Sequence, residues 1–245
     1  MQQQDVWDDE AARRYDTPGT GMFAPGVLDP AVERLVAEAA GGPVLEFAVG
    51  TGRVALPLAA RGVAVTGLEL SRPMVDRLRE KADETALPVV LGDMATTRVP
   101  GEFSLVYLVF NTISNLVTQA GQVACFRNAA RHLRPGGRFL VELFVPDLRS
   151  LPPGAGAAVF AQEPGYLGVD TYDVLAQQLV SHHVRFGAGR SAEVFRSPHR
   201  YVWPSELDLM AQLAGFVLET RDADFAGAEF TAESTSHVSV YRLPG

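Results

Sequence analysis

The chain has 245 residues, of which 47% are hydrophobic, and a formal net charge of −8 at pH 7, so it can form one large domain or one domain with a small subdomain. The acidic balance argues against a nucleic-acid partner, because phosphate contacts need clustered Lys and Arg side chains. The single cysteine, Cys125, excludes an internal disulfide framework, and without a signal peptide or an apolar run of transmembrane length we expect a cytoplasmic protein with no membrane partner.

The first 28 residues show no strong period and predict an irregular arm with a helical turn. Asp29 and Pro30 then predict the N-cap and the first residue of a helix that Gly41-Gly42 end. Apolar runs alternate with helical segments as far as Pro146, which indicates a parallel sheet covered on both faces. The expected strands are 43–50, 64–70, 88–94, 103–111 and 138–146, and the expected helices lie near 53–61, after a cap at Ser71, and near 121–133.

The pattern changes after residue 146. Residues 151–160 (LPPGAGAAVF) predict a flexible connection, and 174–203 predict antiparallel strands joined by a hairpin turn at GAGR. A helix at 204–214 and strands at 216–221 and 237–242 complete the α/β fold. We therefore divide the chain into an N-terminal arm or lid (1–28), a core (29–150), an antiparallel β insertion that forms a second lid (151–203), and a C-terminal unit that completes the core (204–245).

The segment GTGRVA, residues 50–55, satisfies the G-x-G-x-x-A fingerprint of dinucleotide enzymes, which leaves an NAD-dependent oxidoreductase as one alternative. Glu46 lies four residues earlier on an otherwise apolar strand. A carboxylate there suits a ligand with a positive ammonium group and would repel a pyrophosphate. The third strand ends in Gly92-Asp93-Met94, a hydrogen-bond acceptor and a flat apolar contact that suit an adenine ring.

The motifs LEFAVGTGR, GLELSRPM, GDM, VFNTISNL and HLRPGGRFLVEL resemble, in order and spacing over about 44–143, the class I S-adenosylmethionine-dependent methyltransferases. The resemblance implies a Rossmann-like seven-stranded sheet, mostly parallel, with an antiparallel C-terminal strand. It also implies transfer of a methyl group from S-adenosyl-L-methionine to an N or O nucleophile of a small molecule, in the manner of secondary metabolism. A non-catalytic cofactor-binding subunit is a further alternative. The chain departs from many members at Ala48, where they have a third glycine.

By the same resemblance, Glu46 orients the methionine end of the cofactor, Glu69 holds the ribose hydroxyls, and Asp93 accepts from the adenine amino group. The residues that the resemblance assigns to the cofactor are Tyr15, Glu46, Ala48, Gly50, Gly52, Arg53, Glu69, Leu70, Met74, Asp93, Met94 and Asn111. Structural roles stay open beside these: a solvated charge for Glu69, ordinary core for Leu70 and Met94, a turn for Asp93, a helix cap for Asn111, and packing for Tyr15.

An amine acceptor must be unprotonated, and a hydroxyl acceptor needs a base within hydrogen-bond reach. The candidate catalytic bases are His182, His183 and His199 in the insertion and Glu142 on the fifth strand. Adjacent strand residues point to opposite faces, so at most one of His182 and His183 faces the site, and a structural role stays open for both. Those opposite faces, without a nearby cysteine or acidic cluster, also argue against a metal site. The sequence leaves a monomer or a homodimer open.

Overall fold

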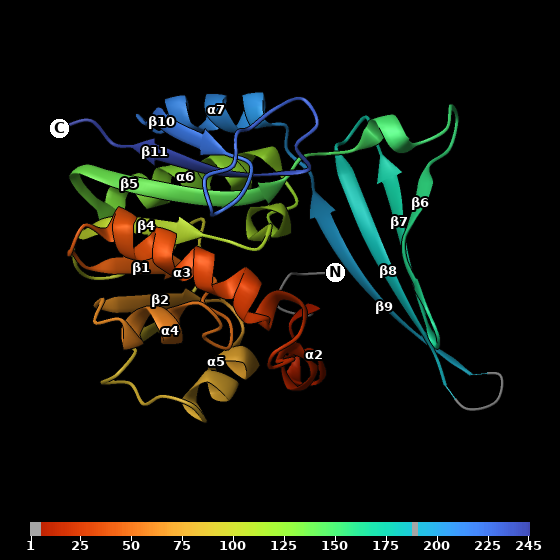
Figure 1. Cartoon of the computed structure of the whole chain (residues 1–245), viewed down its shortest axis with the longest axis horizontal. Coiled ribbons are helices and arrows are strands. Elements are labelled where there is room, and N and C mark those ends of the chain that lie inside the picture. Colours follow the sequence, from red (N-terminus) through yellow and green to blue (C-terminus); the bar gives the residue numbers. More distant parts are fainter. Residues whose placement is uncertain (1–5, 188–190) are drawn as a thin grey trace.

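The computed structural model describes residues 6–187 and 191–245, so three of the four residues of the expected GAGR turn lie outside the described residues. Two sheets organise this part of the chain. A seven-stranded sheet has the order β10-β11-β5-β4-β1-β2-β3, and a four-stranded sheet has the order β6-β7-β8-β9. Figure 1 shows the second sheet standing beside the carboxyl ends of the parallel strands of the first.

The seven-stranded sheet matches the predicted fold class. Neighbouring pairs among β1 to β5 are parallel, whereas β11 runs antiparallel to both β5 and β10. Every residue of β1 and β4 is buried, which explains why these strands are apolar along their whole length. The strands are β1 (Val44–Phe47), β2 (Val65–Glu69), β3 (Val89–Leu91), β4 (Phe103–Leu108), β5 (Leu133–Phe144), β10 (Val217–Asp222) and β11 (Ser236–Arg242).

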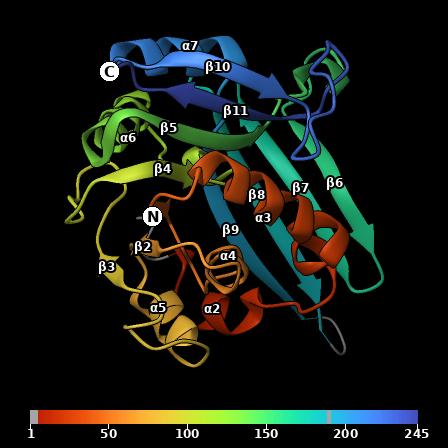
Figure 2. The same ribbon diagram turned by 60° about the vertical axis from the view of Figure 1, so that its left-hand side comes forward.

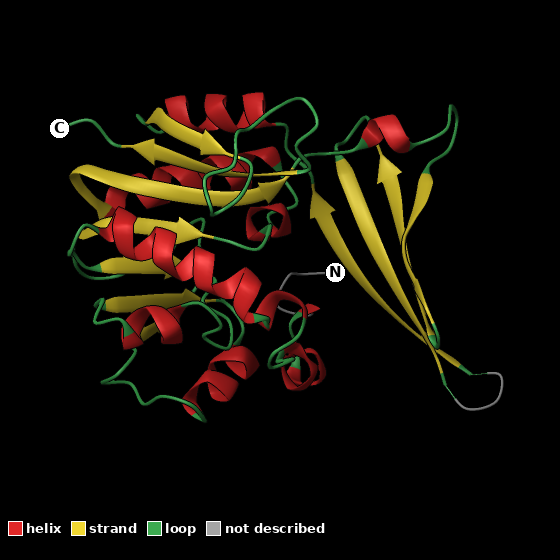
Figure 3. Ribbon diagram, viewed as in Figure 1, coloured by secondary structure: helices red, strands yellow, loops and turns green. Residues whose placement is uncertain are grey.

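Helices cover both faces of this sheet (Figure 3). Apolar side chains of α3, α4 and α5 share one buried cluster with one face of the sheet, and those of α6 and α7 share another with the opposite face. The predicted cap is confirmed, because Ser71 Oγ accepts from the backbone N–H of Met74 at 3.2 Å. The helices are α3 (Pro25–Ala39), α4 (Ala55–Ala60), α5 (Arg72–Arg79), α6 (Gln119–His132) and α7 (Pro204–Leu213).

The predicted start of the first long helix is wrong. Helix α3 begins at Pro25, with Ala24 as N-cap, so Pro30 lies inside the helix. Pro25 already supplies the favoured first-turn proline, and Leu28 packs against the core, so the earlier start buries more apolar surface. Pro30 removes one backbone hydrogen bond, which the helix tolerates near its N-terminal end.

The insertion contains more structure than predicted. The expected flexible connection 151–160 overlaps strand β6, and β7 was not expected as a separate strand; both pair antiparallel with their neighbours. The two strands mix small, polar and aromatic residues, and β6 is mostly exposed while β7 is mostly half-buried, so they lack the apolar run that marks a buried strand. The insertion strands are β6 (Ala157–Glu163), β7 (Tyr166–Asp173), β8 (Gln178–Phe186) and β9 (Ala192–Arg200), preceded by a short 3₁₀ turn, η3 (Leu148–Ser150).

The N-terminal arm forms helix α2 (Asp9–Tyr15) and a 3₁₀ turn, η1 (Gly21–Phe23). Asp8 caps α2 by accepting from the backbone N–H groups of Glu10 and Ala11. In Figure 2, α2 lies beside the end of β9 that begins at Ala192. The arm therefore reaches both the core and the insertion.

Candidate active site

The turn after β1 holds three residues in the left-handed region of backbone space. Ala48, Gly50 and Gly52 have φ values of +54°, +57° and +82°. A Cβ on Gly52 would lie 2.9 Å from Cγ of Leu56, whereas a Cβ on Gly50 would meet no atom closer than 4.0 Å. Gly52 thus allows close packing against α4, and Gly50 leaves open space over the turn. Alanine at position 48 accepts this conformation at a cost of roughly 1 kcal/mol.

Glu69 ends β2 as a buried carboxylate. Its two oxygens accept from the backbone N–H groups of Gly50 and Ser71, each at 2.8 Å. Burial raises the pKa of Glu69, and these backbone donors oppose the rise. The alternative of a solvated charge at a strand end is wrong for this residue, since its side chain is only 6% exposed.

Glu46 is a second buried acid, on β1. The Tyr107 hydroxyl donates to Glu46 Oε2 at 2.6 Å. Burial raises the pKa of Glu46 to about 8, against the opposing effects of the Tyr107 hydrogen bond and the Arg53 charge. A cation placed near this carboxyl group would favour its ionised form.

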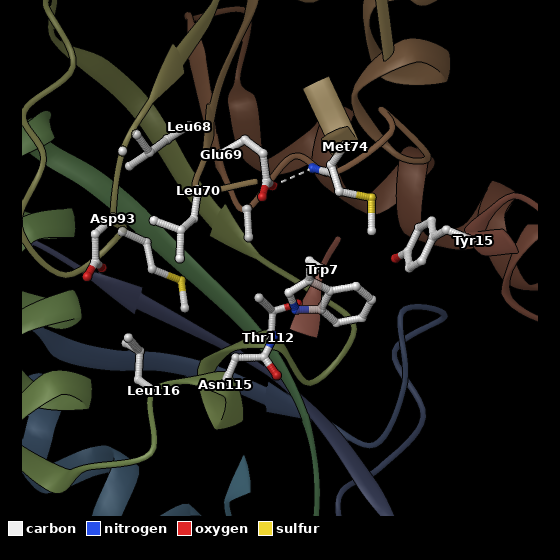
Figure 4. Close-up of a pocket in the computed structure, with 14 residues that line it drawn as sticks. Trp7, Tyr15, Leu68, Glu69, Leu70, Met74, Asp93, Thr112, Asn115 and Leu116 are labelled. Carbon is white, nitrogen blue, oxygen red and sulfur yellow. Dashed lines mark hydrogen bonds between the residues drawn. The ribbon is translucent and has the colours of Figure 1, made fainter. Parts of the chain in front are cut away.

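A cavity of about 120 Å³ opens at the carboxyl ends of β1, β2 and β3 (Figure 4). Eight of the residues that the resemblance assigned to the cofactor line it: Tyr15, Ala48, Gly50, Glu69, Leu70, Met74, Asp93 and Met94. Leu70 is 40% exposed, so it is available for contact rather than ordinary core. The cavity lining thus combines carboxylates with apolar side chains.

Further residues of this cavity were not singled out from the sequence: Trp7, Leu68, Gly92, Thr112, Asn115 and Leu116. Three of them belong to the motif VFNTISNL, which was recognised, but in which only Asn111 was chosen. Trp7 is an isolated aromatic residue in a polar N-terminal segment, and the sequence around it does not indicate that it folds back onto the cavity. In Figure 4 its indole lies between Tyr15 and Thr112, well inside the group of lining residues.

Four of the assigned residues do not line this cavity: Glu46, Gly52, Arg53 and Asn111. Asn111 Oδ1 accepts from the backbone N–H of Phe144 at 2.6 Å and makes no side-chain cap for the 3₁₀ turn η2 (Thr112–Asn115). The helix-cap alternative is therefore wrong. Asn111 links the end of β4 to β5, a positioning role that neither expectation contained.

The arm is fastened over the cavity by hydrogen bonds. Ser71 Oγ donates to the carbonyl oxygen of Trp7 at 2.6 Å. Asp16 accepts from Thr51 Oγ1 at 2.5 Å and from Lys81 Nζ at 2.8 Å. Tyr15 packs edge-on against the Trp7 ring, 5.8 Å between centroids. The arm thus closes one side of the cavity, as a lid would.

A second cavity, of about 340 Å³, lies at the same edge of the sheet, between the start of α3, the ends of β4 and β5, and the loop that joins β10 to β11. Glu142 and Arg53 both line it. Glu142 Oε2 accepts from the backbone N–H of Phe110, and burial raises the Glu142 pKa. Arg53 Nη1 donates to the carbonyl oxygen of Met22 at 3.2 Å, and its guanidinium lies 5.1 Å from the centre of the Phe110 ring.

The insertion histidines line neither of these cavities. His183 shares a hydrogen bond of 2.7 Å with the Tyr166 hydroxyl, while His182 contacts Thr171 Oγ1 at 3.1 Å on the opposite face. Opposite faces were predicted and are confirmed. Glu193, on the same face as His183, lies 3.7 Å from Arg14 of α2, so the His183 face is the one turned toward the arm.

His199 lies on the His183 face near the C-terminal end of β9, where its Nε2 contacts Ser197 Oγ at 3.0 Å. Burial lowers the pKa of His199 to about 4, so this imidazole is neutral at pH 7. Cys125 is a free and fully buried thiol. Within residues 6–187 and 191–245, no helix is both long and apolar enough to span a bilayer, and no cluster of three or more His, Cys, Asp or Glu side chains could hold a metal ion.

Comparison with known proteins assigns the chain to a family. Residues 44–137 match the family described as a methyltransferase domain. The CcbJ methyltransferase of Streptomyces caelestis, a solved structure, is 38% identical, with a TM-score of 0.82 over 100% of this chain and 97% of that one. This chain belongs to the class I S-adenosylmethionine-dependent methyltransferases. The NAD-dependent alternative is therefore wrong, and so is the non-catalytic one.

Two further methyltransferases cover most of the chain. The cypemycin N-terminal methyltransferase of a Streptomyces species is 29% identical over 244 residues, which is 96% of both chains. The glycopeptide N-methyltransferase MtfA, solved with S-adenosyl-L-methionine, is 21% identical with a TM-score of 0.65 over 94% of this chain and 90% of that one, and it shows the shared fold. The methyl donor of this enzyme is accordingly S-adenosyl-L-methionine.

Proposed function

We propose that this methyltransferase transfers the methyl group to an N or O nucleophile of a small molecule in secondary metabolism. The observation that carries the proposal is the pair of cavities at one edge of the sheet, of which the second has the size of a small-molecule site. The relatives support it, since one is named the cypemycin N-terminal methyltransferase and another a glycopeptide N-methyltransferase.

The residues of the first cavity fit the methyl donor. Gly50 leaves open space above the turn, and the Glu69 carboxylate, already fixed by two backbone N–H groups, has lone pairs for ribose hydroxyls. Leu70 and Met94 supply apolar faces for the adenine, and Asp93 supplies an acceptor for its amino group. We assign the cofactor to this cavity, with Glu46 beneath the turn as the acid that favours a positively charged methionine end.

When bound, S-adenosyl-L-methionine supplies a methyl group activated by a sulfonium. The protein therefore has to bind, orient and exclude water rather than form a covalent bond. Tyr15 and Trp7 of the arm cover the donor cavity, and the insertion faces the same edge of the sheet. We infer that the acceptor enters between the arm and the insertion. For both segments we keep the predicted domain boundaries, 1–28 and 151–203.

Calorimetric titration with S-adenosylhomocysteine tests the cofactor site. We expect Glu69→Gln to weaken binding about 100-fold, because it replaces a doubly held carboxylate with a group that also carries N–H donors. Glu80→Gln, on the surface after α5, is the matched control and should bind normally. Equal affinities for wild type and Glu69→Gln would contradict the assignment.

A further inference from the structure

The second cavity has apolar walls and a charged end. Val27, Pro30 and Ala31 of α3 line it together with Val109 after β4, Val238 of β11 and Phe225 of the loop between β10 and β11. Such walls favour a hydrocarbon body over a sugar or a phosphate. The residues between this cavity and the first are the turn after β1 and the end of β4, which contribute to both linings.

The charged end is built around Glu142. One carboxylate oxygen, Oε2, accepts from the backbone N–H of Phe110, which leaves Oε1 for a ligand in the described part of the structure. Arg53 attracts this carboxylate, but its guanidinium is held by the Met22 carbonyl and lies over the Phe23 and Phe110 rings. A partly desolvated carboxylate that accepts only one backbone hydrogen bond is stabilised more by a cationic ligand than by a neutral one.

The acidic group also discriminates between nucleophiles. An ammonium ion can lose its proton to a carboxylate, whereas an aliphatic alcohol is far too weak an acid to do so. Asp224 lies exposed at the mouth of the cavity, and the chain carries a net charge of −8, so the approach of a cation is favoured. Cavity shape, charge and proton chemistry thus favour the same class of acceptor.

We propose that the acceptor is an amine on an apolar scaffold, that the second cavity holds this scaffold, and that Glu142 binds the amine and removes its proton. This inference rests on the proposed function and narrows its N or O nucleophile to nitrogen. It also moves the acid–base role from the insertion histidines to β5.

The ammonium form of the acceptor gives one proton to the Glu142 carboxylate and becomes a neutral amine. The nitrogen lone pair forms the new N–C bond to the methyl group while the C–S bond breaks and its electron pair stays on sulfur. The product leaves as the N-methylated ammonium ion, and Glu142 returns its proton to solvent.

The test uses protein saturated with S-adenosylhomocysteine and two matched probe pairs, benzylamine with benzyl alcohol and cyclohexylamine with cyclohexanol. Saturation-transfer NMR measures their binding. Mass spectrometry measures methylation in a parallel reaction with a deuterated methyl donor. We expect both amines to bind at least about 10-fold more tightly than the alcohols, the effect of one charge-assisted hydrogen bond, and only amines to be methylated.

Two variants locate the effect. Glu142→Gln keeps an oxygen acceptor for the Phe110 N–H and should weaken amine binding about 10-fold. Gly26→Leu places a side chain at the cavity, where an added Cβ meets no atom within 4 Å, and should block amines without disturbing the fold. Ala37→Leu adds an apolar side chain on the exposed side of the same helix and should change nothing.

The outcomes are separable. Affinity for S-adenosylhomocysteine should stay unchanged in all three variants, and wild-type protein that failed to bind it would refute the proposed function itself. The amine proposal is overturned if the cofactor analogue binds but no amine does, if alcohols bind or react as well as amines, or if Glu142→Gln and Gly26→Leu bind amines like wild type.

Discussion

The two sheets of this enzyme differ in how deeply their side chains are buried. In the core, β1 and β4 are buried along their whole length, and aromatic rings such as Phe126 and Phe139 pack edge to face with centroids 5.0 Å apart. In the insertion most strand residues are half-buried or exposed, and Phe160 and Phe195 remain over 40% exposed. The first sheet is stabilised by burial, while the second depends on strand pairing and leaves side chains available to a ligand.

This contrast distinguishes the buried donor site of the core sheet from the exposed side chains of the insertion. We place the methyl donor beside backbone groups and buried acids at the edge of the core sheet, where packing fixes their positions. The insertion presents tyrosines, histidines and Asp170 on the face turned toward the arm. None of the described insertion residues lines either cavity of the core, so the insertion can change without disturbing them.

The largest expected effect is on stability. Phe139→Ala removes a fully buried ring from the core and should lower the free energy of unfolding by about 3–5 kcal/mol. Phe195→Ala removes a ring that is 41% exposed, and should cost less than about 1 kcal/mol. Urea unfolding followed by circular dichroism measures both. Similar losses would show that the insertion is as tightly packed as the core.

The same difference explains what could be predicted from the sequence. Fully buried parallel strands require continuous apolar residues, so β1 and β4 were placed to within about three residues at either end. Strands β6 and β7 carry no such run, and their pairing depends on contacts with distant residues that periodicity does not report. The start of α3 was misplaced because two prolines compete for the first turn, and only packing of Leu28 decides between them.

The site shows a similar limit. Residues that follow a strand within a motif, such as Glu69 and Asp93, could be chosen from sequence because parallel strands bring their carboxyl ends together. Trp7 could not, since its place depends on how the arm folds back onto Ser71. The second cavity was also missed, because it joins segments more than 200 residues apart, from Met22 to Val238.

A smaller effect should come from the buried acid of the core. Folded Glu46 has a pKa of about 8, above its ordinary value near 4.5, so between these values the folded protein keeps a proton that the unfolded chain has lost. Stability should therefore fall as pH rises through this window, by about 1.4 kcal/mol per pH unit at most, and level off above pH 8.

Glu46→Gln removes this titration. Its free energy of unfolding, measured in urea from pH 5 to pH 9, should improve relative to wild type as pH increases. Glu33→Gln, on the exposed side of α3, serves as control, and its difference from wild type should not vary with pH. A constant difference between Glu46→Gln and wild type would mean that Glu46 ionises normally in the folded protein.

The smallest expected effect tests the two faces of the insertion. His183 lies on the face turned toward the arm, and burial lowers its pKa, so it is a neutral hydrogen-bonding group near pH 7. Because we place the acceptor and its base in the second cavity, which His183 does not line, His183→Ala should leave kcat nearly unchanged. It should raise the acceptor KM by no more than about fivefold, the worth of one hydrogen bond made as the acceptor enters. His182→Ala, on the opposite face, should alter neither constant. A large fall in kcat for His183→Ala alone would instead identify His183 as the catalytic base. Equal effects of both variants would mean that the insertion acts only through its stability.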